Sequence, residues 1–343
     1  MQSASLGRTS RRVRGVWVPW RAAMEEALYG VRGFYRTEGA AARHFRTSVH
    51  ASRRFAGAIA TLLAEVDGAL RRPGRLDVVD MGGGDGRLLV DLYAQAPPQL
   101  GQRLRLTVVE RGRRPSDLPA DIRWAPEPPA GICGLIVANE WLDNVPVDVV
   151  EQTIDGARLV LVEPDSGAER IGGRPAEEDR RWLDRWWPLG EPGDRAEVGR
   201  PRDEAWANLV RRLHRGLVIA VDYGHHRHTR PPFGSLTGYR DGRQVRPVPD
   251  GSCDLTAHVA LDACASATGS ILTTQRTALT ALGVHGDRPP HEASGDPRAY
   301  LRQLRTASEE GELIDPHGLG GFGWLVHANG IPVPAPLRGT INA

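Results

Sequence analysis

The residues best suited to chemistry stand together in one short stretch, VVDMGGGDGRLLVD. Apolar, β-favouring residues lead into an acid, Asp80, and an apolar-periodic run follows. Between the two lies a glycine cluster that includes Gly82, Gly84 and Gly86. Glycine permits positive φ and lets a ligand lie against bare backbone. The stretch therefore predicts a cofactor-binding turn between a strand and a helix.

Two common cofactor loops do not fit this turn. A dinucleotide fingerprint places its third glycine where this chain has Arg87. A Walker A loop requires a lysine, and the sequence contains none. The spacing acid-x-G-x-G-x-G resembles motif I of the Rossmann-like S-adenosylmethionine (SAM) methyltransferases, which implies SAM as the cofactor. In that reading Asp80 holds the ammonium group of SAM, and Glu110, at the end of LTVVE, accepts its ribose hydroxyls.

A third acid, Glu140, is the last residue of the stretch GICGLIVANE, and the residues around it carry a more specific resemblance. ANEWLDNVP is similar to the N-E-[FW]-x-D-x-x-P signature of the MidA-type methyltransferases, a family that includes the mitochondrial complex I assembly-factor arginine methyltransferase. EALYGVRGFY, RHFRTSVHASRRF, DYG, GSLTGYR and PDGSCDLTAHV resemble further family segments, and Gln275 takes the place of the family's T-Q pair. The chain departs from the family pattern at Arg43, His44, Val49 and His50, near Gly242 where a histidine is expected, and at Ala260 where an acid is expected.

The resemblance implies a methyltransferase that acts on an arginine of a partner protein, by family likeness a subunit of respiratory-complex type. Carboxylates bind a guanidinium in planar, bidentate geometry. Glu140, with Asp143 or Glu151, is expected to form such a clamp beside Asn139. The predicted catalytic residues are thus Glu140, Asn139 and Asp143.

Alternating strand and helix patterns position these groups. LDVVDMG, RLRLTVVER, GICGLIVANE, GLVIAVDYG and FGWLVHA read as strands, and residues 21–28, 52–70 and 85–95 read as helices. Such alternation predicts an α/β fold with a Rossmann-like class I methyltransferase sheet, in which strand-end acids share one edge. VVEQTIDGARLVLVEPDSG predicts a hairpin turning at Asp155-Gly156, and DLTAHVALDACASAT predicts a helix.

The chain is expected to divide into three parts. Residues 1–70 form an N-terminal arm and helical cover. Residues 71–165 and 212–330 form the SAM-binding domain, and 166–211, rich in charge and tryptophan, form an inserted helical cap. Trp182, Trp186 and Trp187 recur at helical spacing, which indicates core residues.

Composition narrows the function classes. A formal net charge of +2 predicts no nucleic-acid partner, and the lack of an apolar run of about 18 residues predicts no membrane insertion. Three cysteines without ligand spacing predict a reducing compartment and no metal. His225, His226 and His228 lie in a stretch that reads as a solvated loop, and His258 is expected to be a packed or helix-anchoring histidine. We expect a cytoplasmic protein, or alternatively one of the mitochondrial matrix, because the N-terminus is rich in arginine and serine.

Three alternatives stay open at the level of sequence. The same fold could methylate a small molecule or a peptide product, as the altered segment around His44 and His50 suggests. The chain could also be a SAM-binding assembly factor without turnover. An NAD oxidoreductase is the most distant reading, because Arg87 breaks its fingerprint. The sequence does not indicate an oligomeric state.

Overall fold

Seven strands build the central sheet of the computed structural model, which describes residues 15–36, 47–290 and 296–338. Their order is β16-β17-β10-β5-β2-β3-β4, and neighbours from β10 to β4 run parallel. β17 lies antiparallel to both β10 and β16. The strands are β2 (Leu76–Met81), β3 (Leu104–Val109), β4 (Arg123–Ala125), β5 (Ile132–Asn139), β10 (Leu213–Asp222), β16 (Ile271–Thr274) and β17 (Gly323–Asn329). The expected Rossmann-like class I methyltransferase sheet is confirmed.

Both faces of this sheet are covered, which explains why its strands read as nearly continuous apolar runs. Successive side chains of a strand point to opposite faces. Val78 accordingly packs into one hydrophobic core and Val79 into another. Leu135 and Ile136 divide in the same way on β5.

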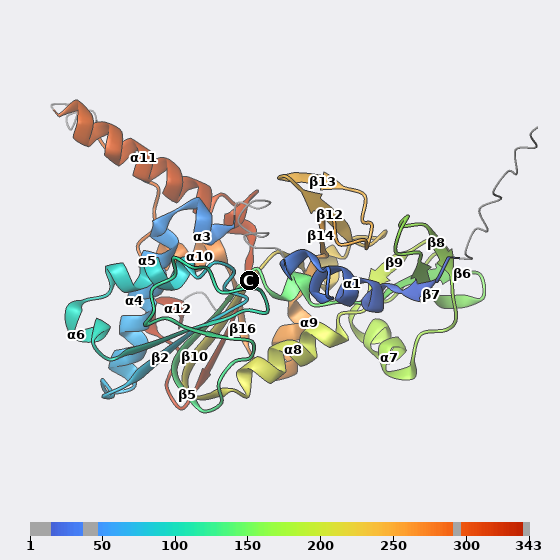
Figure 1. Cartoon of the computed structure of the whole chain (residues 1–343), viewed down its shortest axis with the longest axis horizontal. Coiled ribbons are helices and arrows are strands. Elements are labelled where there is room, and N and C mark those ends of the chain that lie inside the picture. Colours follow the sequence, from blue (N-terminus) through green and yellow to red (C-terminus); the bar gives the residue numbers. More distant parts are fainter. Residues whose placement is uncertain (1–14, 37–46, 291–295, 339–343) are drawn as a thin grey trace, which may run out of the picture.

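Helices from distant parts of the sequence cover the two faces (Figure 1). The first core takes apolar residues from α4 (Arg53–Ala69), α5 (Arg87–Gln95), α10 (Gln275–Ala281), α11 (Pro297–Ile314) and α12 (Ala335–Arg338). The second takes them from α8 (Arg200–Val210) and α9 (Leu261–Thr268). The short helices α3 (Ser48–Ala51) and α6 (Pro98–Gly101) complete the first side.

A second region lies beyond the carboxyl ends of the parallel strands, on the right of Figure 1. Its main sheet has the order β1-β7-β6-β9, with β8 paired to β7, and α1 (Trp20–Tyr29) packs on it. The strands are β1 (Val18–Pro19), β6 (Val149–Thr153), β7 (Gly156–Val162), β8 (Glu169–Ile171) and β9 (Arg195–Glu197). Smaller sheets join β11 (Gly224–His225) to β15 (Val259–Ala260), and β12 (Thr237–Arg240) to β13 (Arg243–Val245) and β14 (Asp254–Thr256).

Residues 166–211, which were predicted to form an inserted helical cap, contain strands as well as helices. They contain the expected helices α7 (Glu177–Trp186) and α8, but they also supply β8 and β9 to the second sheet. Trp182 and Trp187 are buried, as predicted for core residues. The division of the chain at residues 70, 165 and 211 stays a prediction.

Two local predictions were wrong in detail. The hairpin forms, but its two turn residues are Ile154 and Asp155, because Gly156 already pairs with Thr153. The segment from Asp254 is not helical throughout, since it forms β14 and β15 before α9 begins at Leu261. Apolar residues on a short buried strand cannot be distinguished by periodicity from those on a buried helix.

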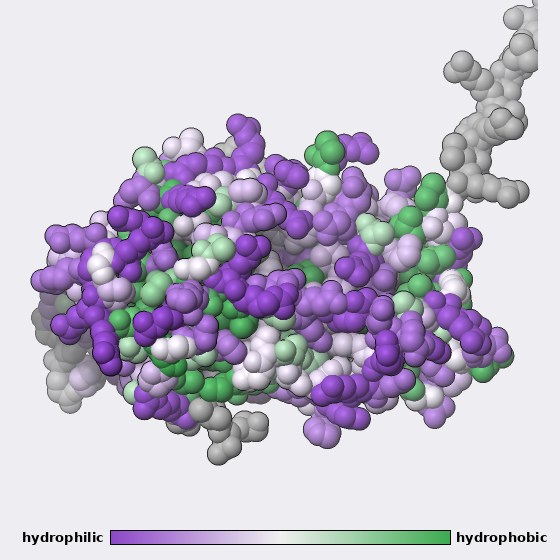
Figure 2. Space-filling model, turned by 90° about the horizontal axis from the view of Figure 1, so that it is seen from below, coloured by the Kyte–Doolittle hydropathy of each residue, from purple (hydrophilic) through white to green (hydrophobic). Residues whose placement is uncertain are grey.

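The surface turned toward the viewer in Figure 2 intersperses hydrophilic residues with smaller hydrophobic groups. Large exposed apolar side chains such as Val31, Phe233 and Leu301 belong to separate segments of the chain. Within residues 15–36, 47–290 and 296–338, no helix combines the length and the apolarity needed to cross a bilayer.

Candidate active site

The glycine turn joins β2 to α5 at the carboxyl ends of the parallel strands, as the sequence predicted. Gly82, Gly84 and Gly86 all have positive φ, at 69°, 56° and 82°. A Cβ on Gly86 would come within 2.7 Å of Leu118, whereas a Cβ on Gly84 would meet no atom within 4 Å. The Gly84 backbone borders a large cavity. The turn therefore offers bare backbone to a ligand.

Asp80 lies at the end of β2 and is only 3% exposed. Burial, followed by the charges of Asp85 and Glu110, raises its pKa from 3.8 to about 7. A Cβ on Gly83 would come within 2.6 Å of an Asp80 oxygen, so Gly83 gives this carboxyl its room. A cationic group placed beside Asp80 would favour its ionised form.

Glu110 follows β3 and ties that strand end to the glycine turn. Its Oε1 accepts backbone hydrogen bonds from Arg111 and Gly112 at 2.7 and 3.1 Å, and its Oε2 accepts one from Gly84 at 3.3 Å. These bonds fix the carboxylate at the cavity wall, and its remaining lone pairs can accept ligand hydroxyls.

Glu140 follows β5 in a backbone conformation that side-chain-bearing residues rarely adopt, with φ of 51°. Its N–H donates to the Val221 carbonyl at 2.7 Å. Its Oε1 accepts from the Ser48 N–H at 3.0 Å and from the Asn139 side-chain amide at 3.1 Å. Burial raises its pKa from 4.5 to about 7, against the opposing effect of the Ser48 hydrogen bond. Such strain, of about 1–3 kcal/mol, is typical of functional loops.

A hydrogen bond between Ser48 and Gln275 joins two segments that resembled the family in the sequence. Ser48 belongs to RHFRTSVHASRRF, and it hydrogen-bonds Gln275 at 3.1 to 3.2 Å. Gln275 is fully buried and also donates to the Leu313 carbonyl. Arg43 and His44 lie outside the described residues. Val49 and His50 line the cavity, and His50 contacts Asp85 at 3.4 Å.

The Asp143 carboxyl is bound by two hydroxyl groups of the protein, which its place in the signature did not predict. Its Oδ2 accepts hydrogen bonds from Thr256 at 2.7 Å and from the Tyr223 hydroxyl. Burial raises its pKa, as it does for the neighbouring Asp222. Asp222 Oδ2 accepts three backbone N–H groups at the start of η2 (Leu142–Asn144), so this acid shapes the loop that carries Glu140.

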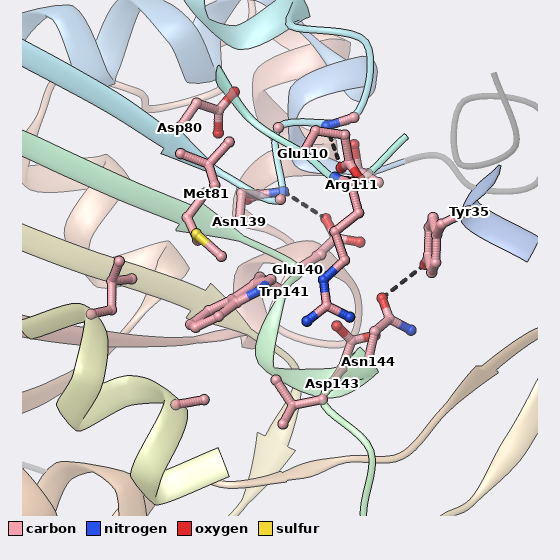
Figure 3. Close-up of a pocket in the computed structure, with 18 of the residues that line it drawn as sticks. Tyr35, Asp80, Met81, Glu110, Arg111, Asn139, Glu140, Trp141, Asp143 and Asn144 are labelled. Carbon is pink, nitrogen blue, oxygen red and sulfur yellow. Dashed lines mark hydrogen bonds between the residues drawn. The ribbon is translucent and has the colours of Figure 1, made fainter. Parts of the chain in front are cut away.

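The predicted site residues come together around one cavity of about 960 Å³ (Figure 3). Asp80, Gly82, Gly84, Glu110, Asn139, Glu140 and Asp143 line it. Gly86 does not line it but is the N-cap residue that precedes α5. Glu151 does not belong to this site, because it lies on β6 beside Arg195.

The histidine predictions hold in part, since His226 and His228 are exposed, as expected of a solvated loop. His225 is buried against Trp187, and burial lowers its pKa to about 3, so it is not part of a solvated loop. His258 lines the cavity and is exposed, although its ring contacts the Tyr223 ring with the two centroids 5.4 Å apart.

Sequence reasoning missed several residues of the cavity wall. Trp141 was noted only as part of the signature, although a Cβ on Gly82 would come within 3.0 Å of its ring. Tyr29 and Tyr35 stack on each other and donate their hydroxyls to Asn144. The aromatic residues of EALYGVRGFY were the available signal for this pair.

A doubly wound sheet with a glycine turn and strand-end acids around one cavity defines a class I methyltransferase. Residues 58–278 match the family described as "Putative S-adenosyl-L-methionine-dependent methyltransferase", and the chain belongs to that family. Its cofactor is SAM. No curated protein matches the chain.

Two solved structures share the fold. One is a Burkholderia thailandensis protein bound to S-adenosyl-homocysteine (SAH), with a TM-score of 0.78 and 24% identity over 96% of this chain and 92% of that one. The other is an uncharacterized protein from the same organism, with a TM-score of 0.74 and 25% identity over 93% of this chain and 88% of that one.

Proposed function

We propose that this methyltransferase transfers the methyl group of SAM to a guanidinium nitrogen of an arginine in a partner protein. The observation that carries the proposal is the Glu140 carboxyl, held at the cavity wall on a strained loop beside the glycine turn. Asp143 and Asp254 also line the cavity, and burial raises the pKa of both carboxyls, so a positive charge beside them would favour their ionised forms. A planar cation is the acceptor that such a wall favours.

The residues present fit SAM. Gly82, Gly84 and Gly86 would give it bare backbone, Asp80 would hold its ammonium group, and Glu110 would accept its ribose hydroxyls. The cofactor supplies an electrophilic methyl group bound to a sulfonium. The raised pKa of Asp80 fits this role, because a buried carboxyl gains a compensating positive charge when the ammonium binds.

Glu140 would act on the acceptor. A free guanidinium keeps its proton to a pKa above about 12, so its nitrogen is a poor nucleophile. Within the described residues, both hydrogen bonds accepted by the Glu140 carboxyl go to Oε1, so Oε2 is the atom that would face the acceptor. The carboxylate would orient one nitrogen and take its proton as the new N–C bond forms and the S–C bond breaks. With a pKa of about 7, it is a better proton acceptor than an exposed glutamate.

Asn139 and Asp143 would support this step from the same loop. Asn139 holds the Glu140 carboxyl through its side-chain amide. Asp143 is tied to Tyr223 and Thr256, so it would position η2 rather than move a proton.

The resemblance to the MidA-type methyltransferases supports the arginine acceptor and a partner of respiratory-complex type. We further propose a cytoplasmic location, with the mitochondrial matrix as the alternative. A small acceptor is the second candidate, and the size of the cavity favours it, since about 960 Å³ is at the upper end of typical small-ligand sites.

Labelled SAM incubated with the protein and a cell lysate tests the proposal. We expect label in methylated arginine after hydrolysis of the protein fraction, and none with Glu140→Gln. SAH titrated into the same variant by calorimetry shows whether its cofactor site remains intact. Label confined to small molecules would contradict the arginine assignment.

A further inference from the structure

The cavity wall also carries a basic side chain, Arg111. Arg111 follows Glu110, whose carboxylate accepts the Arg111 backbone N–H at 2.7 Å. The backbone of Arg111 is thus fixed by the cofactor-side acid. In the view of Figure 3 its side chain extends from there past Glu140 toward Asp143 and Asn144.

The Arg111 guanidinium is bound by two residues of α1. Nη1 donates to Glu25 Oε1 at 3.1 Å, and the guanidinium carbon lies 4.6 Å from the centre of the Tyr29 ring. Glu25 and Tyr29 are four residues apart, so they lie on the same helix face, and both line the cavity. An acid and an aromatic ring at this spacing form a binding site for a planar cation.

This pair of residues is fixed to the loop that carries Glu140. Tyr29 donates its hydroxyl to the Asn144 carbonyl at 3.1 Å, and it stacks on Tyr35, which donates to the Asn144 side chain at 2.9 Å. Any cation bound at Glu25 and Tyr29 therefore lies at a set position relative to Glu140.

We propose that Glu25 and Tyr29 form a cation subsite for the methyl acceptor, and that Arg111 occupies this subsite until the acceptor's guanidinium replaces it. This inference rests on the proposed function, because it takes the acceptor to be a guanidinium. Breaking the Arg111–Glu25 ion pair requires little free energy, because both side chains are about half exposed, at 53% and 56%. The acceptor would gain the contacts that Arg111 gives up.

Binding of a small guanidinium probe tests the subsite without requiring turnover. Nα-acetyl-arginine methyl ester is titrated by calorimetry into the SAH-bound protein. Removing the internal competitor by Arg111→Ala should tighten its binding about 5-fold, from the strength of one exposed ion pair and one cation–π contact. Arg113→Ala removes the same charge two residues away, outside the cavity, and should leave the affinity unchanged.

A second substitution shows whether the gain arises at α1. In the Arg111→Ala background, Glu25→Gln should abolish the gain, whereas Glu26→Gln, on the neighbouring exposed acid outside the cavity, should preserve it. Unchanged or weaker probe binding in Arg111→Ala, or equal effects of the two glutamine variants, would overturn the subsite. Failure of the proposed function has a different signature: the probe binds as expected, but it and arginine-containing proteins receive no methyl group.

Discussion

Replacing Asp80 by asparagine should stabilise the ligand-free protein while removing its affinity for SAM. The amide keeps the shape of the carboxyl but carries no charge. Folding raises the pKa of Asp80 from 3.8 to about 7, and a carboxyl that is harder to ionise in the folded protein destabilises it once ionised.

The size of the effect depends on pH, and its sign follows from linkage. The folded protein holds the Asp80 proton more tightly than the unfolded chain does, so stability falls as pH rises from about 4 to about 7. The shift corresponds to about 4 kcal/mol at about pH 8 and about 2 kcal/mol at about pH 5.5. Asp80→Asn should recover most of this amount at each pH.

Urea unfolding at these two pH values measures the difference. Asp117→Asn, on an exposed acid outside the cavity, serves as the control and should change stability little at either pH. SAH should stabilise the parent protein but not Asp80→Asn. A variant that is less stable than the parent at about pH 8, or equally stabilised at both pH values, would refute the reasoning from burial.

Four further outcomes are expected. Glu140→Gln should lower kcat at least about 100-fold, as loss of a positioned proton acceptor does, while SAH affinity measured by calorimetry stays within a few-fold. In the parent protein, kcat should fall as pH drops below an apparent pKa of about 7, because Glu140 becomes protonated; a flat profile from about pH 6 to 8 would contradict this. Gly84→Ala and Gly131→Ala should each lower the free energy of unfolding by about 1 kcal/mol, since both glycines have positive φ and open space around the position of a Cβ. Gly84 lines the cavity and Gly131 does not, so only Gly84→Ala should weaken SAH binding, by more than about 10-fold. SAM binding at about pH 6.5 should release protons, seen as a buffer-dependent binding enthalpy, because its ammonium favours ionised Asp80; proton uptake would rule that contact out.

The strands and the glycine turn could be predicted because their signals are local. The apolar run before Asp80 is buried on both faces, and Gly82, Gly84 and Gly86 have the positive φ that favours glycine. The edge position of Glu110 and Glu140 then follows from parallel strand order alone.

The remaining parts of the site depend on contacts between distant residues. Asp143 meets Tyr223 and Thr256 across 80 and 113 residues of sequence, so no spacing rule could show that its carboxyl was already engaged. Glu151 is close to Glu140 in sequence, but the hairpin that begins at Val149 carries it to another sheet. No motif in the sequence singled out Arg111, because its guanidinium meets Glu25 and Tyr29 through the packing of α1 against the same cavity.

The acids of this site share one physical property that links cofactor and acceptor. Asp80 and Glu140 come from neighbouring strands, and burial raises the pKa of each to about 7. Neither can be fully ionised in the ligand-free protein without a cost, and both become favourable beside a positive charge. SAM brings its ammonium and sulfonium, and an arginine brings its guanidinium. If the proposed function holds, a cavity that is costly when empty would bind two cations, and Glu140 on its strained loop would direct the second toward the methyl group.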